Sequence, residues 1–109
     1  MSLHFIDIWV NCPDRETAER IAAACIEERL AACANIFAPI ASQYRWKGGV
    51  ETDEEVPVVL KTRAEHFKAV CDTVRPLHPF EVPSIVATEL THIDQAYADW
   101  LREETREPA

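Results

Sequence analysis

The sequence has almost no glycine and no paired-cysteine motif. Only two of its 109 residues are glycine, and both lie in one KGG segment at 47–49. The glycine-rich phosphate loops GxxxxGKS/T and GxGxxG are therefore absent, and so are GxSxG and HExxH. The four cysteines form no CxxC pair, which excludes zinc-ribbon and thioredoxin-like patterns. A Cys–His pair in space is the one catalytic arrangement left open, and we predict that the chain is not an enzyme.

Positive charge and long apolar runs are also scarce. The chain has 11 Lys and Arg against 19 Asp and Glu, a formal net charge of −8. An acidic surface repels phosphate, so we expect no nucleic-acid partner. No run approaches the roughly 18–20 apolar residues of a membrane span, so we expect no membrane partner. The start, MSLHFIDIWV, lacks the basic segment of a signal peptide, and we expect a cytoplasmic protein with reduced cysteines.

Apolar residues make up 48% of the chain, enough for one packed core. The length predicts a single domain over residues 1–109. Its polar end, REETREPA, predicts a solvated tail that is flexible from about residue 104.

The periodicity of apolar residues switches repeatedly between that of strands and that of helices. It predicts strands at 3–12, 33–46, 50–63 and 83–91, and helices from Asp14 to about 31, at 64–74 and after Asp94. The long second strand contains Pro39, where we expect a bend. The order β-α-β-β-α-β plus a C-terminal helix predicts an α+β, ferredoxin-like fold with an antiparallel sheet.

One face of such a sheet is left without helices. Phe5, Trp9 and part of the 33–46 strand are predicted to project from that bare face. An apolar area of this size predicts self-association. The alternative is that these are scattered surface hydrophobes, which are common in monomers.

The segment LHPFEVPS, residues 77–84, combines a histidine and an acid in a stretch that two prolines stiffen. His78 and Glu81 are a ligand pair that suits copper, zinc or nickel. Two ligands are too few for a tight site, but a symmetric oligomer repeats them. The alternative is a hydrogen-bonded structural histidine and a surface acid. Cys12 and Cys33 are candidate ligands for soft Cu(I), whereas Cys25 and Cys71 fit the apolar stripes of helices.

Lys61 stands in an otherwise apolar strand. A lysine there needs a charged partner or a water-filled cleft. It either contacts an anion or ligand in a cleft beside Trp46 and Tyr44, or extends along a strand edge into solvent.

Five segments in unbroken order resemble the CutA family of divalent-cation-tolerance proteins: ERLAACANI (28–36), YRWKGGVE (44–51), LKTR (60–63), HPFEVPSIVA (78–87) and YADWL (97–101). The resemblance implies a ferredoxin-like homotrimer linked to tolerance of divalent metals, especially copper. The trimeric architecture of the family is also similar to that of the PII signalling proteins, which bind ligands in clefts between subunits.

The resemblance also implies roles for single residues. His78 and Glu81 match the family's HPYE motif, and Trp46 and Lys61 match its WxG and KT elements, all lining a cleft between protomers. Phe80 stands where the family usually has tyrosine, and the cleft set becomes Lys61, Trp46, Tyr44 and Phe80.

Other positions depart from the family. Ser84 replaces a usual glutamate, and Val10 and Leu77 replace a cysteine and a histidine proposed as copper ligands. Cys12, two places along the same strand face as Val10, is the candidate substitute.

We therefore expect a cytoplasmic homotrimeric tolerance protein that binds Cu(II) or another divalent cation through His78, Glu81 and Cys12. The alternatives are a PII-like trimer that binds a small molecule and a trimeric scaffold without a ligand.

Overall fold

The computed structural model describes residues 4–108 and has the predicted α+β architecture. Its elements run in the order β1 (Phe5–Cys12), α1 (Arg15–Glu27), β2 (Cys33–Ile36), β3 (Ile40–Trp46), β4 (Gly49–Arg63), α2 (Phe67–Val74), β5 (Ile85–Glu89) and α3 (Gln95–Glu104). Short 3₁₀ turns at Ala64–His66 and Arg75–Leu77 flank α2. In this described part, no helix is long and apolar enough to cross a membrane.

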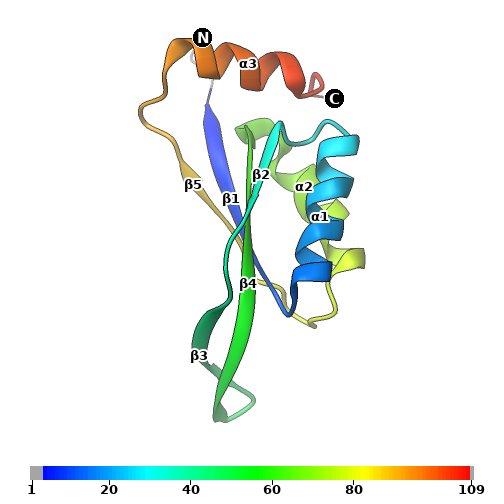
Figure 1. Ribbon diagram of the computed structural model, residues 1–109, viewed down its shortest axis with the longest axis vertical. Helices are drawn as coiled ribbons and strands as arrows, with labels where there is room; N and C mark the ends of the chain where they lie inside the picture. The colour runs from blue at the N-terminus through cyan, green and yellow to red at the C-terminus, as the bar shows by residue number, and fades with distance from the viewer. Residues whose placement is uncertain (1–3, 109) are drawn as a thin grey trace.

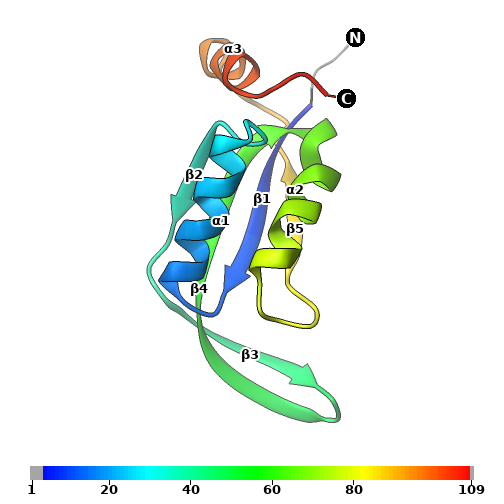
Figure 2. The same cartoon turned by 90° about the vertical axis from the view of Figure 1, so that its right-hand side faces the viewer.

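The five strands form one sheet in the order β2-β4-β1-β5, and β3 pairs with the outer half of β4. Every pairing is antiparallel. Helices α1 and α2 lie side by side on one face of the sheet (Figure 2), and the β3–β4 hairpin extends beyond them (Figure 1). The ferredoxin-like prediction is confirmed.

The main core fills the space between the sheet and these two helices. Alternate residues of β1 point into it, because successive side chains of a strand face opposite ways. The same holds for β4, where Val56, Val58 and Leu60 alternate inward. The strand and helix residues of this core that are buried include Ile6, Ile8, Val10, Cys12, Ile21, Cys25, Val70 and Val74.

The start of α1 follows the sequence prediction closely. Asp14 is its N-cap, and its carboxylate accepts a hydrogen bond from the Thr17 N–H at 2.8 Å. This bond satisfies one of the free amides of the first helical turn. The helix ends earlier than predicted, because Arg29 adopts a φ of 57° and turns the chain toward β2.

The bend expected at Pro39 is confirmed, but it is a full break, because residues 37–39 divide the predicted single strand at 33–46 into β2 and β3. The partners of β2 on β4 follow Ile36↔Val58, whereas those of β3 follow Ile40↔Glu55. From Ile36 to Ile40 the chain advances four positions, whereas the paired residues on β4, Val58 and Glu55, are only three positions apart. Pro57 lies at this irregular point. Proline has no N–H to donate, and the sheet needs no hydrogen bond from that position here. The break lets the hairpin leave the main sheet.

The bare face of the sheet differs from the prediction at Phe5. Helix α3 crosses one end of that face, and Phe5 is only 4% exposed against Ala98 and Leu101. Trp9 remains on the open part, with its ring 5.6 Å from that of Phe37. The open apolar face is therefore smaller than expected, because α3 covers the end at which Phe5 lies.

The C-terminal tail is anchored at some residues, although others are exposed as predicted: Glu103, Glu104, Arg106 and Glu107. Thr105 is 3% exposed, and its hydroxyl accepts a hydrogen bond from Arg63 Nε at 2.8 Å. Arg63 Nη2 donates to the carbonyls of Arg102 and Thr105 at 2.6 and 2.9 Å. His66 Nε2 donates to the Arg106 carbonyl at 2.7 Å. The single domain and the flexibility of this tail stay predictions.

Candidate functional site

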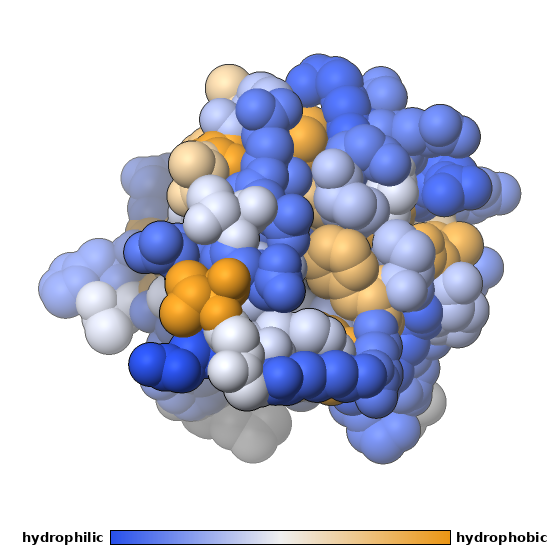
Figure 3. Space-filling view, turned by 90° about the horizontal axis from the view of Figure 1, so that it is seen from below, coloured by the Kyte–Doolittle hydropathy of each residue, from blue (hydrophilic) through white to orange (hydrophobic). Residues whose placement is uncertain are grey.

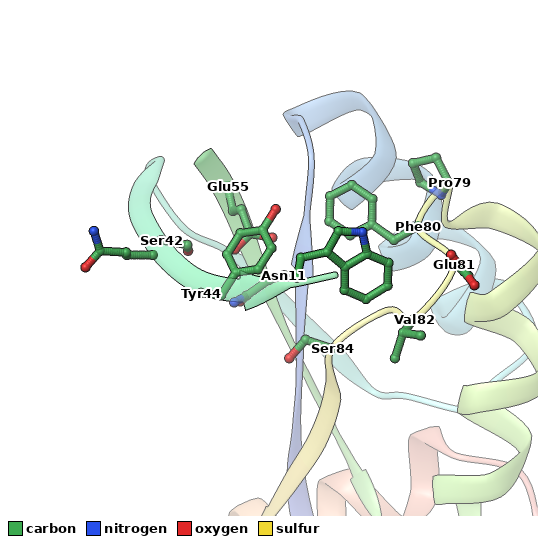
Figure 4. Close-up of a pocket in the computed structure, with 11 residues that line it drawn as sticks. Asn11, Ser42, Tyr44, Glu55, Pro79, Phe80, Glu81, Val82 and Ser84 are labelled. Atoms are coloured by element: carbon green, nitrogen blue, oxygen red, sulfur yellow. The ribbon is translucent and has the colours of Figure 1, made fainter. Parts of the chain in front are cut away.

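A cavity of about 690 Å³ lies between the β3–β4 hairpin and the loop that precedes β5. Figure 4 shows side chains from both elements around it. The residues that line it come from β1, the hairpin and the proline-bounded loop: Asn11, Ser42, Gln43, Tyr44, Trp46, Glu55, Pro79, Phe80, Glu81, Val82 and Ser84. None of these lining residues is basic.

Two local features of the sequence create this cavity. The KGG turn places Lys47 and Gly48 at φ values of 48° and 84°, and so reverses the chain into β4. The prolines at 79 and 83 prevent the opposite loop from continuing a helix or joining a ladder. Lys47 Nζ lies 3.4 Å from a carboxylate oxygen of Glu81, which brings the hairpin tip to this loop.

Aromatic side chains form much of the cavity wall. Tyr44, Trp46 and Phe80 all line it and remain partly exposed. The Tyr44 hydroxyl donates a hydrogen bond to Asp53. That bond, with desolvation and the charges of Asp53, Glu51 and Glu55, raises the pKa of Tyr44 to about 12. The phenol is neutral at physiological pH, as an unperturbed tyrosine also is. Tyr44, Trp46 and Phe80 are brought together as predicted.

Glu55 is the acidic residue of this wall that the sequence analysis did not select. It is only 8% exposed, and within residues 4–108 its carboxylate makes no hydrogen bond or ion pair. In Figure 4 it lies beside Tyr44, on the side of the cavity away from Glu81. Its position in the run ETDEE gives no sign of burial, because burial depends on where β4 leaves the sheet.

His78 is buried and fully hydrogen-bonded. It is 6% exposed, and its Nε2 donates to the Asn11 carbonyl at 2.8 Å. Its Nδ1 accepts from the Phe80 N–H at 3.2 Å, and the two rings meet edge to face at 4.8 Å. Both ring nitrogens are therefore in use, which is the structural alternative weighed for this histidine. It holds the loop to β1.

Cys12 is equally unsuited to bind a metal in this conformation. It is 0% exposed in the main core, and its Sγ lies 4.0 Å from the Val10 carbonyl. Burial, with the charges of Asp14 and Glu55, raises the pKa of its thiol to about 11. A metal binds the thiolate, not the thiol. The substitution of Cys12 for a ligand at position 10 therefore has no geometric support.

Of the three predicted metal ligands, only Glu81 has an accessible side chain. The structure does not bring it together with His78 and Cys12 in one coordination sphere. Over residues 4–108, no group of three or more His, Cys, Asp or Glu side chains is arranged to hold a metal ion. The described part of one chain therefore has separate carboxylates but no complete set of ligands for a cation.

Lys61 lies outside the cavity. It occupies the open face of the sheet beneath α3, with its Nζ 5.8 Å from the centre of the Tyr97 ring. Its neighbours across the strands are Asp7 and Cys33. Within one chain Lys61 and Trp46 do not share a cavity, and their meeting in a cleft between protomers stays a prediction.

Comparison with known proteins gives the family. The model of the CutA1 divalent ion tolerance protein family matches residues 6–104. The chain belongs to the CutA1 family. It is 43% identical to the divalent-cation tolerance protein CutA of Thermus thermophilus, over 90% of this chain and 95% of that one. It is 40% identical to human protein CutA over 89% of its length, but spans only 54% of the human protein.

Solved CutA1-family structures have the same fold. The rice CutA1 structure aligns with a TM-score of 0.92 at 36% identity, covering 97% of both chains. The periplasmic divalent cation tolerance protein CutA of Archaeoglobus fulgidus aligns with a TM-score of 0.89 at 38% identity, covering 92% of this chain and 97% of that one. The Thermus and Archaeoglobus relatives of this CutA1-family chain are named as divalent cation tolerance proteins, and none of the relatives cited is named as an enzyme.

Proposed function

We propose that this chain is a homotrimeric divalent-cation-tolerance protein that binds the cation in clefts between subunits. The observation that carries the proposal is the family match over residues 6–104. The activity is binding rather than catalysis. The cleft is the cavity between the hairpin and the proline-bounded loop, completed by a neighbouring subunit.

The trimer has support in the apolar surface left on the open face of the sheet. Phe37 and Val86 are exposed there, and Val86 is the cross-strand neighbour of Trp9. Further apolar side chains lie on the hairpin, where Val50 is exposed. Seen from the hairpin end, such side chains alternate with hydrophilic ones (Figure 3). Exposed large apolar side chains that lie close together mark a surface for protein contacts.

Glu81 is the proposed cation contact within the cleft. Its only ion pair within residues 4–108 is with Lys47, and both side chains are exposed. Such a pair contributes little and exchanges readily. Because His78 and Cys12 offer no free nitrogen or thiolate, oxygen ligands from two subunits form the site. Oxygen ligands favour magnesium, calcium or manganese over copper.

Equilibrium dialysis of the metal-free protein against Mn(II), Mg(II) and Cu(II) tests this proposal. We expect Glu81→Gln to weaken the affinity for the cation by about tenfold, which is the effect of losing one charged ligand contact. Glu65→Gln, at an exposed acid outside the cavity, is the matched control. Uptake that is unaltered by Glu81→Gln, or that has no fixed stoichiometry, contradicts the site.

We also propose a cytoplasmic location. All four cysteines lie in the described part of the chain and none is in a disulfide, as expected in a reducing compartment. Cell fractionation tests it, and recovery from the periplasm, the compartment named for the Archaeoglobus relative, contradicts it.

The second candidate is a trimer that binds a small molecule. The aromatic cavity favours it, since ligand sites are concave and mostly apolar with a few polar groups. Lys61, which the PII-like alternative uses, does not line this cavity within one chain, so only a neighbouring subunit could bring it there. Because no basic residue lines the cavity, an anionic ligand such as a nucleotide is disfavoured.

A further inference from the structure

We infer that the cavity binds an organic cation: a protonated primary amine carried on a small apolar body. The inference shares its cavity with the proposed cation site but does not depend on a metal. It rests on Glu55, on the aromatic walls and on the position of Lys47.

Glu55 supplies the charge that such a ligand neutralises. The Glu55 side chain is 8% exposed and has no hydrogen-bond or ion-pair partner within residues 4–108. Its carboxylate oxygens are not among the fully buried unpaired atoms, so they are open to the cavity and not committed to another group. It lines the cavity, so a ligand there can reach it. An ammonium group with its three N–H donors makes charge-assisted hydrogen bonds to a carboxylate.

The aromatic residues favour a cation with an apolar body. Tyr44, Trp46 and Phe80 line the same cavity as Glu55. The faces of aromatic rings attract ammonium groups, and the rings also pack against hydrocarbon. The Tyr44 hydroxyl donates to Asp53, and the phenol is neutral at physiological pH, as a tyrosine ordinarily is. The wall thus keeps this character throughout the physiological pH range.

At the edge of the cavity, the ammonium group of Lys47 already makes contacts of the kind proposed for the ligand. Its ammonium lies 5.5 Å from the centre of the Trp46 ring and 3.4 Å from Glu81. An ammonium of the chain itself is thus placed between an aromatic ring and a carboxylate. It pairs with Glu81 and not with Glu55, so the inner acid remains available. A volume of about 690 Å³ leaves room for a ligand of roughly ten non-hydrogen atoms.

The test is calorimetric titration of the full-length protein with 2-phenylethylammonium chloride in the presence of EDTA. The neutral analogue 2-phenylethanol has the same shape without the charge. We expect the ammonium compound to bind about tenfold or more tightly than the alcohol, as loss of a charge-assisted contact predicts. Equal binding of the two, or no binding of the ammonium compound, overturns the inference.

Two variants locate the site. Glu55→Gln should weaken ammonium binding by about tenfold, whereas the matched control Glu54→Gln, at the exposed neighbouring acid, should not. Phe80→Leu keeps all charges and should also weaken binding, which decides the matter if the Glu55→Gln variant does not fold. Unchanged binding in Glu55→Gln or Phe80→Leu overturns the assignment. Because EDTA removes metals, this result is independent of the divalent-cation proposal.

Discussion

At the scale of single residues, His78 shows how a buried polar side chain gains a structural role. Its two ring nitrogens join a strand carbonyl at Asn11 to a loop amide at Phe80. The sequence predicted that His78 and Glu81 lie near a cleft, and the aromatic residues with them. The sequence left open whether His78 is a ligand or a hydrogen-bonded structural histidine, and it could not name the partners, because a hydrogen bond over 67 positions depends on tertiary contacts that spacing does not encode.

Replacing His78 with alanine should destabilise the fold without abolishing cation uptake. The change leaves the Asn11 carbonyl without its buried donor, at a cost of about 2 kcal/mol in the free energy of unfolding. Urea denaturation at fixed protein concentration measures this. His92→Ala is the control, since His92 is exposed and bonds only its neighbour Thr91 within residues 4–108. A stable His78→Ala protein that no longer binds the cation would restore the ligand interpretation.

At the scale of elements, the sequence predicted the features that depend on neighbouring residues and missed those that depend on contacts between distant segments. Capping by Asp14 and Asp94 and the apolar stripe of α2 follow from adjacent residues. The break between β2 and β3 and the docking of α3 on Phe5 do not. The break depends on how two strands share one partner, and the docking depends on where the chain returns after β5.

The N-cap of α1 predicts a specific pH dependence. The Thr17 amide lowers the pKa of Asp14 below its ordinary 3.8. The carboxylate therefore stabilises the fold above that ordinary value, and this contribution is lost as the pH falls through the lower folded value. Asn also caps but does not titrate. When the pH is lowered from neutral to below about 3, the free energy of unfolding should therefore fall less in Asp14→Asn than in the parent protein.

Urea unfolding of both proteins at the two pH values measures this difference. Glu16→Gln removes an exposed acid from the same turn and serves as the control. An equal loss of stability in Asp14→Asn and the parent contradicts the capping argument.

Arg63 should be the residue on which the C-terminal tail depends most. Its buried guanidinium donates to Thr105 and Arg102, so Arg63→Met leaves these acceptors unpaired. The expected loss is about 3 kcal/mol, from more than one hydrogen bond to a charged group. Thermal unfolding and proteolysis of the tail measure it. Arg15→Met, at an exposed helix position, should change neither, and a tail that stays resistant in Arg63→Met contradicts this role.

At the scale of the whole molecule, the open face of the sheet should mediate self-association. Val86 is 55% exposed beside Trp9, and a lysine there would place a charge in the apolar contact. We expect Val86→Lys to convert the proposed trimer to smaller species in size-exclusion chromatography with light scattering. Ile26→Lys, on the exposed side of α1, should remain trimeric. Equal behaviour of the two variants would place the interface elsewhere.

The most direct test of the whole account is native mass spectrometry of the metal-free protein, followed by titration with Mn(II) and Cu(II). The account predicts a trimer that takes up cations in a fixed number set by its three equivalent clefts, and fewer in Glu81→Gln. A monomer would contradict both the subunit arrangement and the completed cleft. A trimer that stays bare, or takes up metal without a fixed number, would contradict cation binding.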